Sequence, residues 1–304
     1  MYTVPDQTGR RFVVTGSNSG TGREFAKRVA AAGGEVVLAV RTPEKGEEAK
    51  REILDASPEA RVEVRRIDLA DLASVREFAE GIRRDDRPLD VLVNNAGVMA
   101  PPKRMTTKDG FELQFGGNHL GHFALTELLL PVLLRAEEPV VATMSSAVAS
   151  VGRIHFADLQ RRRGYVPMLA YAQSKLANLL MSQHLARVAA DRGWNLTSTA
   201  AHPGFTRTNL QSAGANLGRT TPRKGTFSEP RLIPTQDVSQ GAEPLLYAGT
   251  SPRAVSGAYY GPSGALALVG PAETVSLPRS AHGVDLAASL WAVSEALTGT
   301  RLPE

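Results

Sequence analysis

The sequence predicts an α/β fold: one doubly wound domain spanning 1–304, with a mainly parallel sheet flanked by helices on both faces. Short β-branched runs alternate with longer amphipathic stretches over about the first 230 residues, the pattern of a parallel sheet. A glycine-rich turn joins the first run to the first amphipathic stretch. With 304 residues, the chain can bury a core of normal size.

The expected elements follow in order, each strand a short apolar run and each helix an amphipathic stretch after it. Strands are expected at 11–15, 35–40, 61–67, 90–93, 140–144 and 196–201. Helices are expected from the glycine-rich turn to about 32, from Pro43, and over 71–84, 110–134 and 168–191. Pro43 suits a first helical turn, because the N–H that it lacks would be unpaired there.

Two stretches interrupt this alternation, and a tail follows it. The segment 151–166 is polar and basic, and 206–234 is rich in Gly, Pro, Thr and Arg. Long irregular loops in a compact domain are usually functional, so we interpret 151–166 as an insert and 206–234 as a substrate-side loop. The tail 257–304 is expected to hold an edge strand at 257–260 and a closing helix at 285–297.

Composition excludes several functions. The chain has no cysteine, which rules out disulfides, Cys-ligated zinc and a cysteine nucleophile, and no metal site is indicated. Without a signal pattern or a run of 18 apolar residues, no transmembrane anchor is expected, and we predict a cytoplasmic location. The net charge is only +4, and aromatic residues do not interleave with the basic run 161–163, so nucleic-acid binding is not expected.

The turn between Thr15 and Gly22 predicts a dinucleotide site of the Rossmann type. Its three glycines let the turn tighten and the backbone approach a ligand, while N–H groups at the following helix start would face a phosphate. The alternative is a plain loop, but strand, turn and helix at the start of a βαβ unit favour the dinucleotide. The residues expected to bind the cofactor here are Gly16, Ser17, Asn18, Ser19, Gly20, Thr21 and Gly22.

The end of the second strand indicates which dinucleotide binds. An acidic residue there would bind the ribose hydroxyls, whereas an arginine accommodates a 2′-phosphate. This chain has Val40-Arg41-Thr42 at that position, and Arg41 can pair with phosphate through charge-assisted hydrogen bonds. We therefore expect NADP(H) to be preferred, with NAD(H) open as an alternative. Arg41 could instead only cover the adenine or point to solvent.

Tyr171 and Lys175 form the most informative pair in the chain. Four positions apart in an expected helix, they share one face. A tyrosine has an ordinary pKa of about 10, and a nearby cation lowers it. The pair could therefore donate a proton in carbonyl or alcohol chemistry, although the same spacing also arises by chance in many helices.

Taken in order along 11–208, these motifs resemble the short-chain dehydrogenase/reductase superfamily. Asp68-Leu69 is similar to the pair that borders the adenine, and Asn94-Asn95-Ala96-Gly97 to the motif after the fourth strand. Pro203-Gly204 with Thr206 matches the segment beside the nicotinamide. The resemblance implies a catalytic tetrad of Asn118, Ser146, Tyr171 and Lys175. It extends the cofactor-binding set to Arg41, Asp68, Leu69, Asn95, Ala96, Gly97, Tyr171, Lys175, Pro203, Gly204 and Thr206.

Finer features resemble the retinol dehydrogenase branch of that superfamily. These are Leu38–Arg41, Asn118–Phe123, Ser145-Ser146, Ile154–Leu159 and Tyr171–Asn178. The chain departs from the branch in beginning almost at its first strand, where those enzymes often carry an apolar anchor, and in the tail 261–304. The protochlorophyllide reductase branch is similar too, but it uses an active-site cysteine that this chain lacks.

The resemblance implies hydride transfer between NADP(H) and a carbonyl or alcohol. Ser146 would stabilise the substrate oxygen, Tyr171 transfer the proton, Lys175 hold the ribose and lower the pKa of Tyr171, and Asn118 hold a water. Apolar residues after the motifs suggest a small hydrophobic substrate, or else simply pack the core: Val98, Met99, Val148, Phe205 and Leu210.

Parts of the sequence are also compatible with other functions. The main alternative is a non-catalytic NADP(H)-binding sensor or scaffold on the same fold. Separately, the resemblance implies a possible homo-oligomer, since family members often form dimers or tetramers. An extended-type epimerase would space its glycines differently. A Ser-His-Asp hydrolase would need a Gly-x-Ser-x-Gly elbow, which the chain lacks, so His119, His122 and His202 are expected to pack or to hydrogen-bond.

Overall fold

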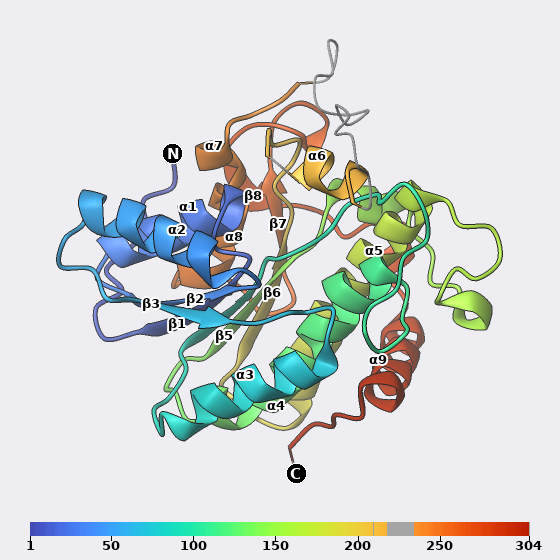
Figure 1. Cartoon of the computed structure of the whole chain (residues 1–304), viewed down its shortest axis with the longest axis horizontal. Coiled ribbons are helices and arrows are strands. Elements are labelled where there is room, and N and C mark those ends of the chain that lie inside the picture. Colours follow the sequence, from blue (N-terminus) through green and yellow to red (C-terminus); the bar gives the residue numbers. More distant parts are fainter. Residues whose placement is uncertain (209, 218–233, 304) are drawn as a thin grey trace.

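One mostly parallel sheet organises the molecule (Figure 1). In the computed structural model, which describes residues 1–208, 210–217 and 234–303, eight strands lie in the order β3-β2-β1-β4-β5-β6-β7-β8. Neighbours pair in parallel except β7 and β8, which are antiparallel. The strands are β1 Arg11–Thr15, β2 Glu35–Val40, β3 Val62–Arg66, β4 Val91–Asn94, β5 Val140–Met144, β6 Thr197–Ala201, β7 Tyr259–Pro262 and β8 Ala272–Thr274. The predicted fold class is confirmed.

Helices cover both faces of this sheet. They are α1 Gly20–Ala31, α2 Pro43–Ala56, α3 Leu72–Arg84, α4 Gly121–Leu133, α5 Pro167–Asp191, α6 Leu210–Ala215, α7 Val238–Gly241, α8 Glu243–Thr250 and α9 Val284–Thr298. Alternate residues of β1 divide the core, since Val13 packs with α3 and α4 while Phe12 and Val14 pack with α1, α2 and α8. Within the described residues, no helix is both long and apolar enough to cross a bilayer.

The structure corrects two expectations about element boundaries. The strand at Tyr259–Pro262 is not an edge strand, because the short β8 pairs outside it. The long helix expected over 110–134 starts instead as a π-helical turn at Phe115–Leu120 and becomes regular only in α4. Neither feature leaves a periodic signal: β8 has three residues, and the π-turn shifts one hydrogen-bond register. The predicted loop 206–234 lies partly outside the described residues.

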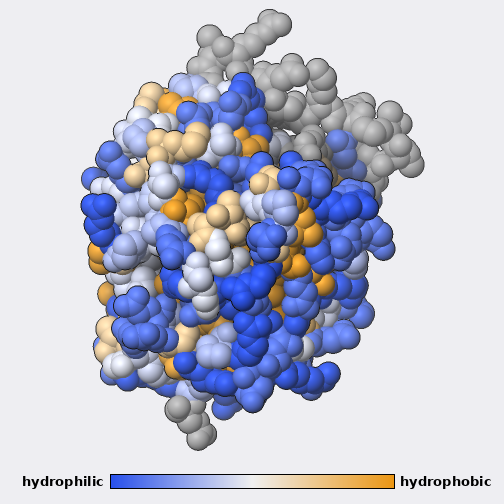
Figure 2. Space-filling view, turned by 90° about the vertical axis from the view of Figure 1, so that its left-hand side faces the viewer, coloured by the Kyte–Doolittle hydropathy of each residue, from blue (hydrophilic) through white to orange (hydrophobic). Residues whose placement is uncertain are grey.

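The free edge at β3 is protected by charge. Its sequence Val-Glu-Val-Arg-Arg alternates apolar and charged side chains, and Glu63 and Arg66 are exposed. Figure 2 views the molecule from this side and shows mostly hydrophilic residues, with hydrophobic ones in scattered groups. Charged side chains on an edge strand discourage pairing with another chain, so this edge is not a surface for sheet extension.

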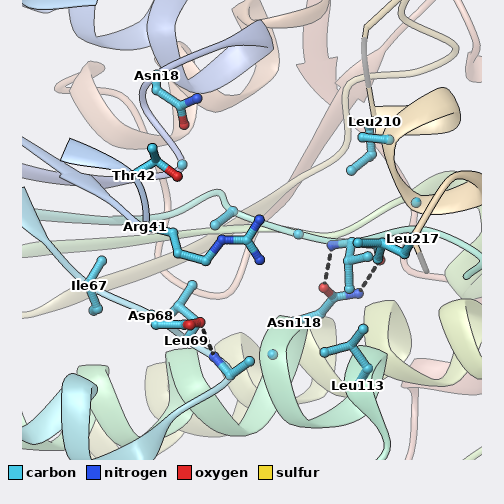
Figure 3. Close-up of a pocket in the computed structure, with 18 of the residues that line it drawn as sticks. Asn18, Arg41, Thr42, Ile67, Asp68, Leu69, Leu113, Asn118, Leu210 and Leu217 are labelled. Carbon is cyan, nitrogen blue, oxygen red and sulfur yellow. Dashed lines mark hydrogen bonds between the residues drawn. The ribbon is translucent and has the colours of Figure 1, made fainter. Parts of the chain in front are cut away.

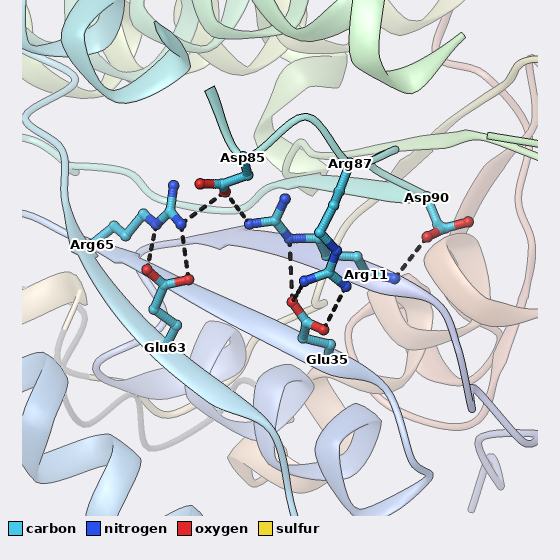
Figure 4. Close-up of polar contacts among 7 residues, drawn as sticks. All are labelled: Arg11, Glu35, Glu63, Arg65, Asp85, Arg87 and Asp90. Atoms are coloured by element: carbon cyan, nitrogen blue, oxygen red, sulfur yellow. Dashed lines mark hydrogen bonds and ion pairs between the residues drawn. The ribbon is translucent and has the colours of Figure 1, made fainter. Parts of the chain in front are cut away.

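A charged network ties together the amino ends of the central strands, opposite the edge where the predicted site lies (Figure 4). Arg11, at the start of β1, is almost fully buried and pairs with Asp85 and with Glu35, whose Oε1 lies 3.4 Å from Nε. Arg65 and Arg87 complete the pairs, at 2.8 Å from Asp85 and Glu35 respectively. The network fixes β1, β2 and β3 relative to the loop that follows α3.

Arg11→Met is expected to lower the free energy of unfolding by about 2–4 kcal/mol in urea denaturation, because it leaves two carboxylates short of a buried partner. Arg84→Met, which removes an exposed i,i+4 pair with Glu80, should change it by under about 0.5 kcal/mol. Equal effects of the two substitutions would contradict this account.

The same network predicts how the Arg11→Met difference varies with pH. Hydrogen bonds from Arg87 lower the pKa of Glu35. Burial raises the pKa of Asp85, but hydrogen bonds from Arg11 and Arg65 outweigh it and leave the pKa below its ordinary value. A lowered folded-state pKa stabilises the fold above the unfolded pKa of about 4, and this is lost as pH falls. The difference between wild type and Arg11→Met should therefore shrink in acid.

Candidate active site

The glycine-rich turn is held rigidly between β1 and β4. The Thr15 hydroxyl accepts hydrogen bonds from the backbone N–H groups of Asn95 and Ala96, at 2.9 and 3.0 Å. The Asn95 amide donates to the Thr15 carbonyl at 2.9 Å and accepts from the Thr21 hydroxyl at 2.9 Å. The Asn-Asn-Ala-Gly motif thus fixes the glycine-rich turn that follows β1.

Two glycines of this turn have no room for a side chain. Gly16 has a φ of +65°, and a Cβ there would lie 2.9 Å from Ala96. A Cβ on Gly22 would lie 2.4 Å from Asn95 Nδ2 and 2.6 Å from the Gly16 carbonyl oxygen. Ser17 is fully buried in the turn, and its hydroxyl has no protein partner. A close-packed turn with a spare buried hydroxyl at the start of α1 fits a phosphate group.

Two adjoining cavities open along the carboxyl ends of the strands, of about 420 and 440 Å³. Both are lined by Gly16, Asn18, Ala96 and Gly97. Figure 3 shows the first, with the Arg41 side chain reaching across it between Asn18 on one side and Asp68 on the other. Leu69, Thr42 and Lys45 complete that end. Two adjoining cavities, one of them lined by Arg41 and Lys45, suit the two halves of a dinucleotide.

The second cavity collects three predicted catalytic side chains. Ser146 follows β5 and caps a short 3₁₀ turn, and its Oγ accepts from the Val148 N–H at 3.4 Å. Tyr171 and Lys175 project from α5 into the same cavity, with Nζ 5.9 Å from the centre of the Tyr171 ring. The Lys175 ammonium donates to the Met144 carbonyl at 3.1 Å. The end of β5 and the helix α5 therefore bring these three side chains to one cavity.

The pKa values of Tyr171 and Lys175 in this cavity differ from what their spacing in the sequence suggests. Burial raises the pKa of Tyr171 to about 12, although a hydrogen bond with Ser146 pulls it back down. Burial also lowers the pKa of Lys175 to about 8. Spacing alone suggested that Lys175 lowers the pKa of Tyr171, but desolvation dominates both groups. A positive charge close to Tyr171 would oppose this effect of burial on its pKa.

Asn118 lies in the π-turn, a geometry common at functional sites. Its amide donates to the Val98 carbonyl at 2.9 Å and to the Ser174 hydroxyl at 3.0 Å, and accepts from the Val98 N–H at 2.8 Å. A Cβ on Gly97 would lie 3.4 Å from Asn118 Oδ1 and 3.5 Å from Lys175 Nζ, so both groups face Gly97. Because both amide hydrogens are used, Asn118 could accept a hydrogen bond from a water near Lys175 but not donate one.

The three histidines have packing and hydrogen-bonding positions, as expected. Burial lowers the pKa of His122 to about 4, so the ring is neutral. Its Nδ1 lies 2.8 Å from the Asn118 carbonyl, which can only accept, and its Nε2 lies 2.9 Å from the Thr15 hydroxyl. His122 thus links the π-turn to the glycine-rich turn. His119 hydrogen-bonds Ser294 of α9, and His202 accepts from the Gly204 N–H.

Most of the predicted cofactor-binding residues line one of the two cavities. Asp68 and Leu69 line the first, while Pro203, Gly204 and Thr206 line the second with Ser19, Gly20, Thr21 and Asn95. Ser17 and Gly22 line neither. The five apolar residues predicted at a substrate pocket also line these cavities: Val98, Met99, Val148, Phe205 and Leu210.

Comparison with known proteins decides the family. The pattern described as short chain dehydrogenase matches residues 10–216, more than half of the chain. The chain belongs to the short-chain dehydrogenase family. Members of this family are oxidoreductases that act on CH–OH and C=O groups. The resemblance stated from the motifs is therefore confirmed, and so is its retinol dehydrogenase-like branch.

Known relatives of this dehydrogenase include retinol dehydrogenase 13 of Homo sapiens, 38% identical over 99% of this chain and 87% of that protein. Retinol dehydrogenase 11 of Homo sapiens is 45% identical, but the match covers 66% of this chain and only 63% of the relative. Among solved structures, an uncharacterized protein from Mycobacterium paratuberculosis has a TM-score of 0.81 and 41% identity, covering 99% and 97% of the two chains. A short chain dehydrogenase from Shigella flexneri complexed with NADP has a TM-score of 0.63 and 25% identity, covering 84% and 97%.

Some residues at the site of this dehydrogenase were not predicted. Lys45 lines the first cavity beside Arg41, and its position four residues later, in the first turn of a helix, could have indicated it. Ser174, next to Lys175, holds Asn118. The Ser145 hydroxyl donates to the Lys175 carbonyl at 2.8 Å, joining the end of β5 to α5. The last two contacts join distant elements, so sequence spacing carries no sign of them.

Proposed function

We propose that this dehydrogenase transfers hydride between NADP(H) and an apolar carbonyl or alcohol substrate. The carrying observation is the meeting of Ser146, Tyr171 and Lys175 in one apolar-lined cavity that adjoins the glycine-rich turn. The name of its retinol dehydrogenase relatives and the NADP complex of a solved relative support the substrate class and the cofactor. The experiment that tests this is NADPH oxidation with retinaldehyde and a series of saturated aldehydes and ketones.

In this proposal, each catalytic residue of the chain has a separate role. When bound, the dinucleotide supplies or receives the hydride. The Ser146 hydroxyl holds the substrate oxygen and stabilises the charge that develops on it. Tyr171 gives that oxygen its proton in reduction and takes it back in oxidation. Lys175 would orient the ribose, and a positive charge on the oxidised nicotinamide would oppose the effect of burial on the pKa of Tyr171.

The preference for NADP(H) rests on the charge of the first cavity. Arg41 reaches into it (Figure 3), Lys45 lines the same cavity, and no carboxylate stands at the end of β2 where a ribose hydroxyl would need one. Asp68 lies on the opposite side, after β3. Two cations at one end of the cavity match a 2′-phosphate better than a neutral ribose.

Arg41→Ala is expected to reduce the ratio of kcat/KM with NADPH to that with NADH by about 10- to 100-fold, the loss of one charge-assisted contact. Initial rates with both cofactors measure this ratio. Arg51→Ala is the matched control, since it removes the same charge from the exposed face of α2, and should leave the ratio unchanged. An unchanged ratio in Arg41→Ala would remove Arg41 from the specificity argument.

The alternative function is a non-catalytic NADP(H) sensor or scaffold. Against it, all four tetrad residues are kept, and three of them share one cavity. A sensor would bind NADPH without oxidising it against any aldehyde or ketone of the series. The oligomeric state and the cytoplasmic location stay predictions, the first open to light scattering of the purified protein and the second to fractionation.

A further inference from the structure

We propose that Tyr259 is a positioning residue of the active site, whose phenol holds the Ser146 turn where the reaction needs it. The inference rests on the proposed function above. Tyr259 lies on β7, far from the tetrad in the sequence, and is 5% exposed. Its hydroxyl donates to the Ser146 carbonyl at 3.2 Å, across 113 positions of sequence.

A second hydroxyl, that of Ser145, ties the end of β5 to α5. It donates to the Lys175 carbonyl at 2.8 Å. The Tyr259 and Ser145 hydroxyls therefore hold neighbouring parts of the site, the first through the Ser146 carbonyl and the second through the helix that carries Tyr171 and Lys175. Without Tyr259, the Ser146 carbonyl would lose a hydrogen-bond donor inside the protein.

The ring of Tyr259 packs against a third part of the site. Its centre lies 5.1 Å from that of the His202 imidazole. His202 accepts from the Gly204 N–H at 3.3 Å, and a Cβ on Gly261 would lie 2.0 Å from its Nε2. Burial lowers the pKa of His202 to about 4, so the ring is neutral, and it packs between Tyr259 and Gly261. Tyr259 thus connects the Ser146 turn with the Pro203–Gly204 segment.

The position of Ser146 affects Tyr171 directly, because their hydrogen bond lowers the pKa of the phenol against the effect of burial. The titratable groups that face this centre are Lys175 on α5, His122 from α4, Tyr259 from β7 and, behind Tyr259, His202 after β6. If Ser146 drifts, the hydrogen bond weakens and the pKa of Tyr171 rises. Reduction needs the protonated phenol and oxidation the phenolate, so the limb of each pH profile that Tyr171 controls moves to higher pH.

The test is Tyr259→Phe, which removes one oxygen and keeps the ring. We expect kcat/KM for the best aldehyde of the series to fall by about 10- to 100-fold, with the affinity for NADPH nearly unchanged and the Tyr171-controlled limb shifted upward. Tyr260→Phe is the matched control. It removes a phenol from the next residue of β7, on the opposite face, where the hydroxyl accepts from the Val255 N–H at 2.8 Å. It should leave the pH profile at its wild-type position.

A wild-type pH profile and wild-type turnover in Tyr259→Phe would overturn the proposal. Should that variant fail to fold, Tyr259→Met also removes the donor to the Ser146 carbonyl while a flexible apolar side chain fills the space, and an unshifted profile there counts against the proposal equally. Failure of the proposed function gives a different result: either the wild-type protein turns over no aldehyde or ketone, or Tyr171→Phe stays fully active. The two failures are therefore distinguishable with the same assay.

Discussion

Tyr171→Phe is expected to lower kcat by about 10²- to 10⁴-fold, the usual contribution of a positioned proton donor. The ring is almost fully buried and keeps its packing, so only the hydroxyl that would meet the substrate oxygen is lost. NADPH should bind with nearly the wild-type affinity, because the glycine-rich turn and Arg41 are untouched. Initial rates of NADPH oxidation, together with a fluorescence titration of NADPH binding, measure the two effects separately.

Tyr165→Phe is the matched control for this substitution. Tyr165 lies in the insert, half-buried, and its hydroxyl accepts from the Gln114 amide at 3.1 Å outside both cavities. It should keep near-normal turnover, which ties the loss in Tyr171→Phe to the cavity rather than to removal of a phenol. Full activity in Tyr171→Phe would reject the mechanism. NADPH binding with no turnover in the wild-type protein would favour the sensor instead.

The parallel sheet could be predicted because its signal is local. Five of the first six strands are buried runs of apolar or β-branched residues, and the structure places all six within one residue of the expected bounds. The exception is the edge strand β3, in which charged residues accompany the valines. A strand was also expected at 257–260, and the structure places it at Tyr259–Pro262. The last strand, β8, could not be placed from such a run. The edge strand β8 has three residues, two of them exposed, and is held by pairing with β7 rather than by its own composition.

The candidate site could be predicted where it depends on order along the chain. The glycine-rich turn, Arg41 and the Tyr171–Lys175 pair each follow a strand or occupy one helix face, so sequence spacing fixes their place. Tyr259 could not be predicted, because its link to Ser146 depends on β7 lying beside β6. Sequence spacing also could not show that the pKa of Tyr171 is raised rather than lowered, because the direction depends on how completely this residue of α5 is buried.

The glycine-rich turn gives the second large effect. Gly22→Ala is expected to raise the Kd for NADPH at least about 100-fold, because the added methyl group would meet two fixed groups of the turn. One is the Gly16 carbonyl, and the other is the Asn95 amide, already bonded to the Thr15 carbonyl at 2.9 Å. Neither can move away without opening the turn that positions the first N–H groups of α1. The free energy of unfolding should fall by about 1–3 kcal/mol from the same overpacking.

Gly81→Ala separates this steric effect from the general effect of replacing a helical glycine. A Cβ at Gly81 in α3 would meet only Arg65 Nη1, at 3.8 Å, an ordinary contact. That variant should bind NADPH normally and gain up to about 1 kcal/mol of stability, since alanine favours a helix over glycine. Wild-type NADPH affinity in Gly22→Ala would mean that the turn does not cradle the dinucleotide. A loss confined to Gly22→Ala, with Gly81→Ala binding normally, assigns the binding to the close approach of backbone that only glycine permits.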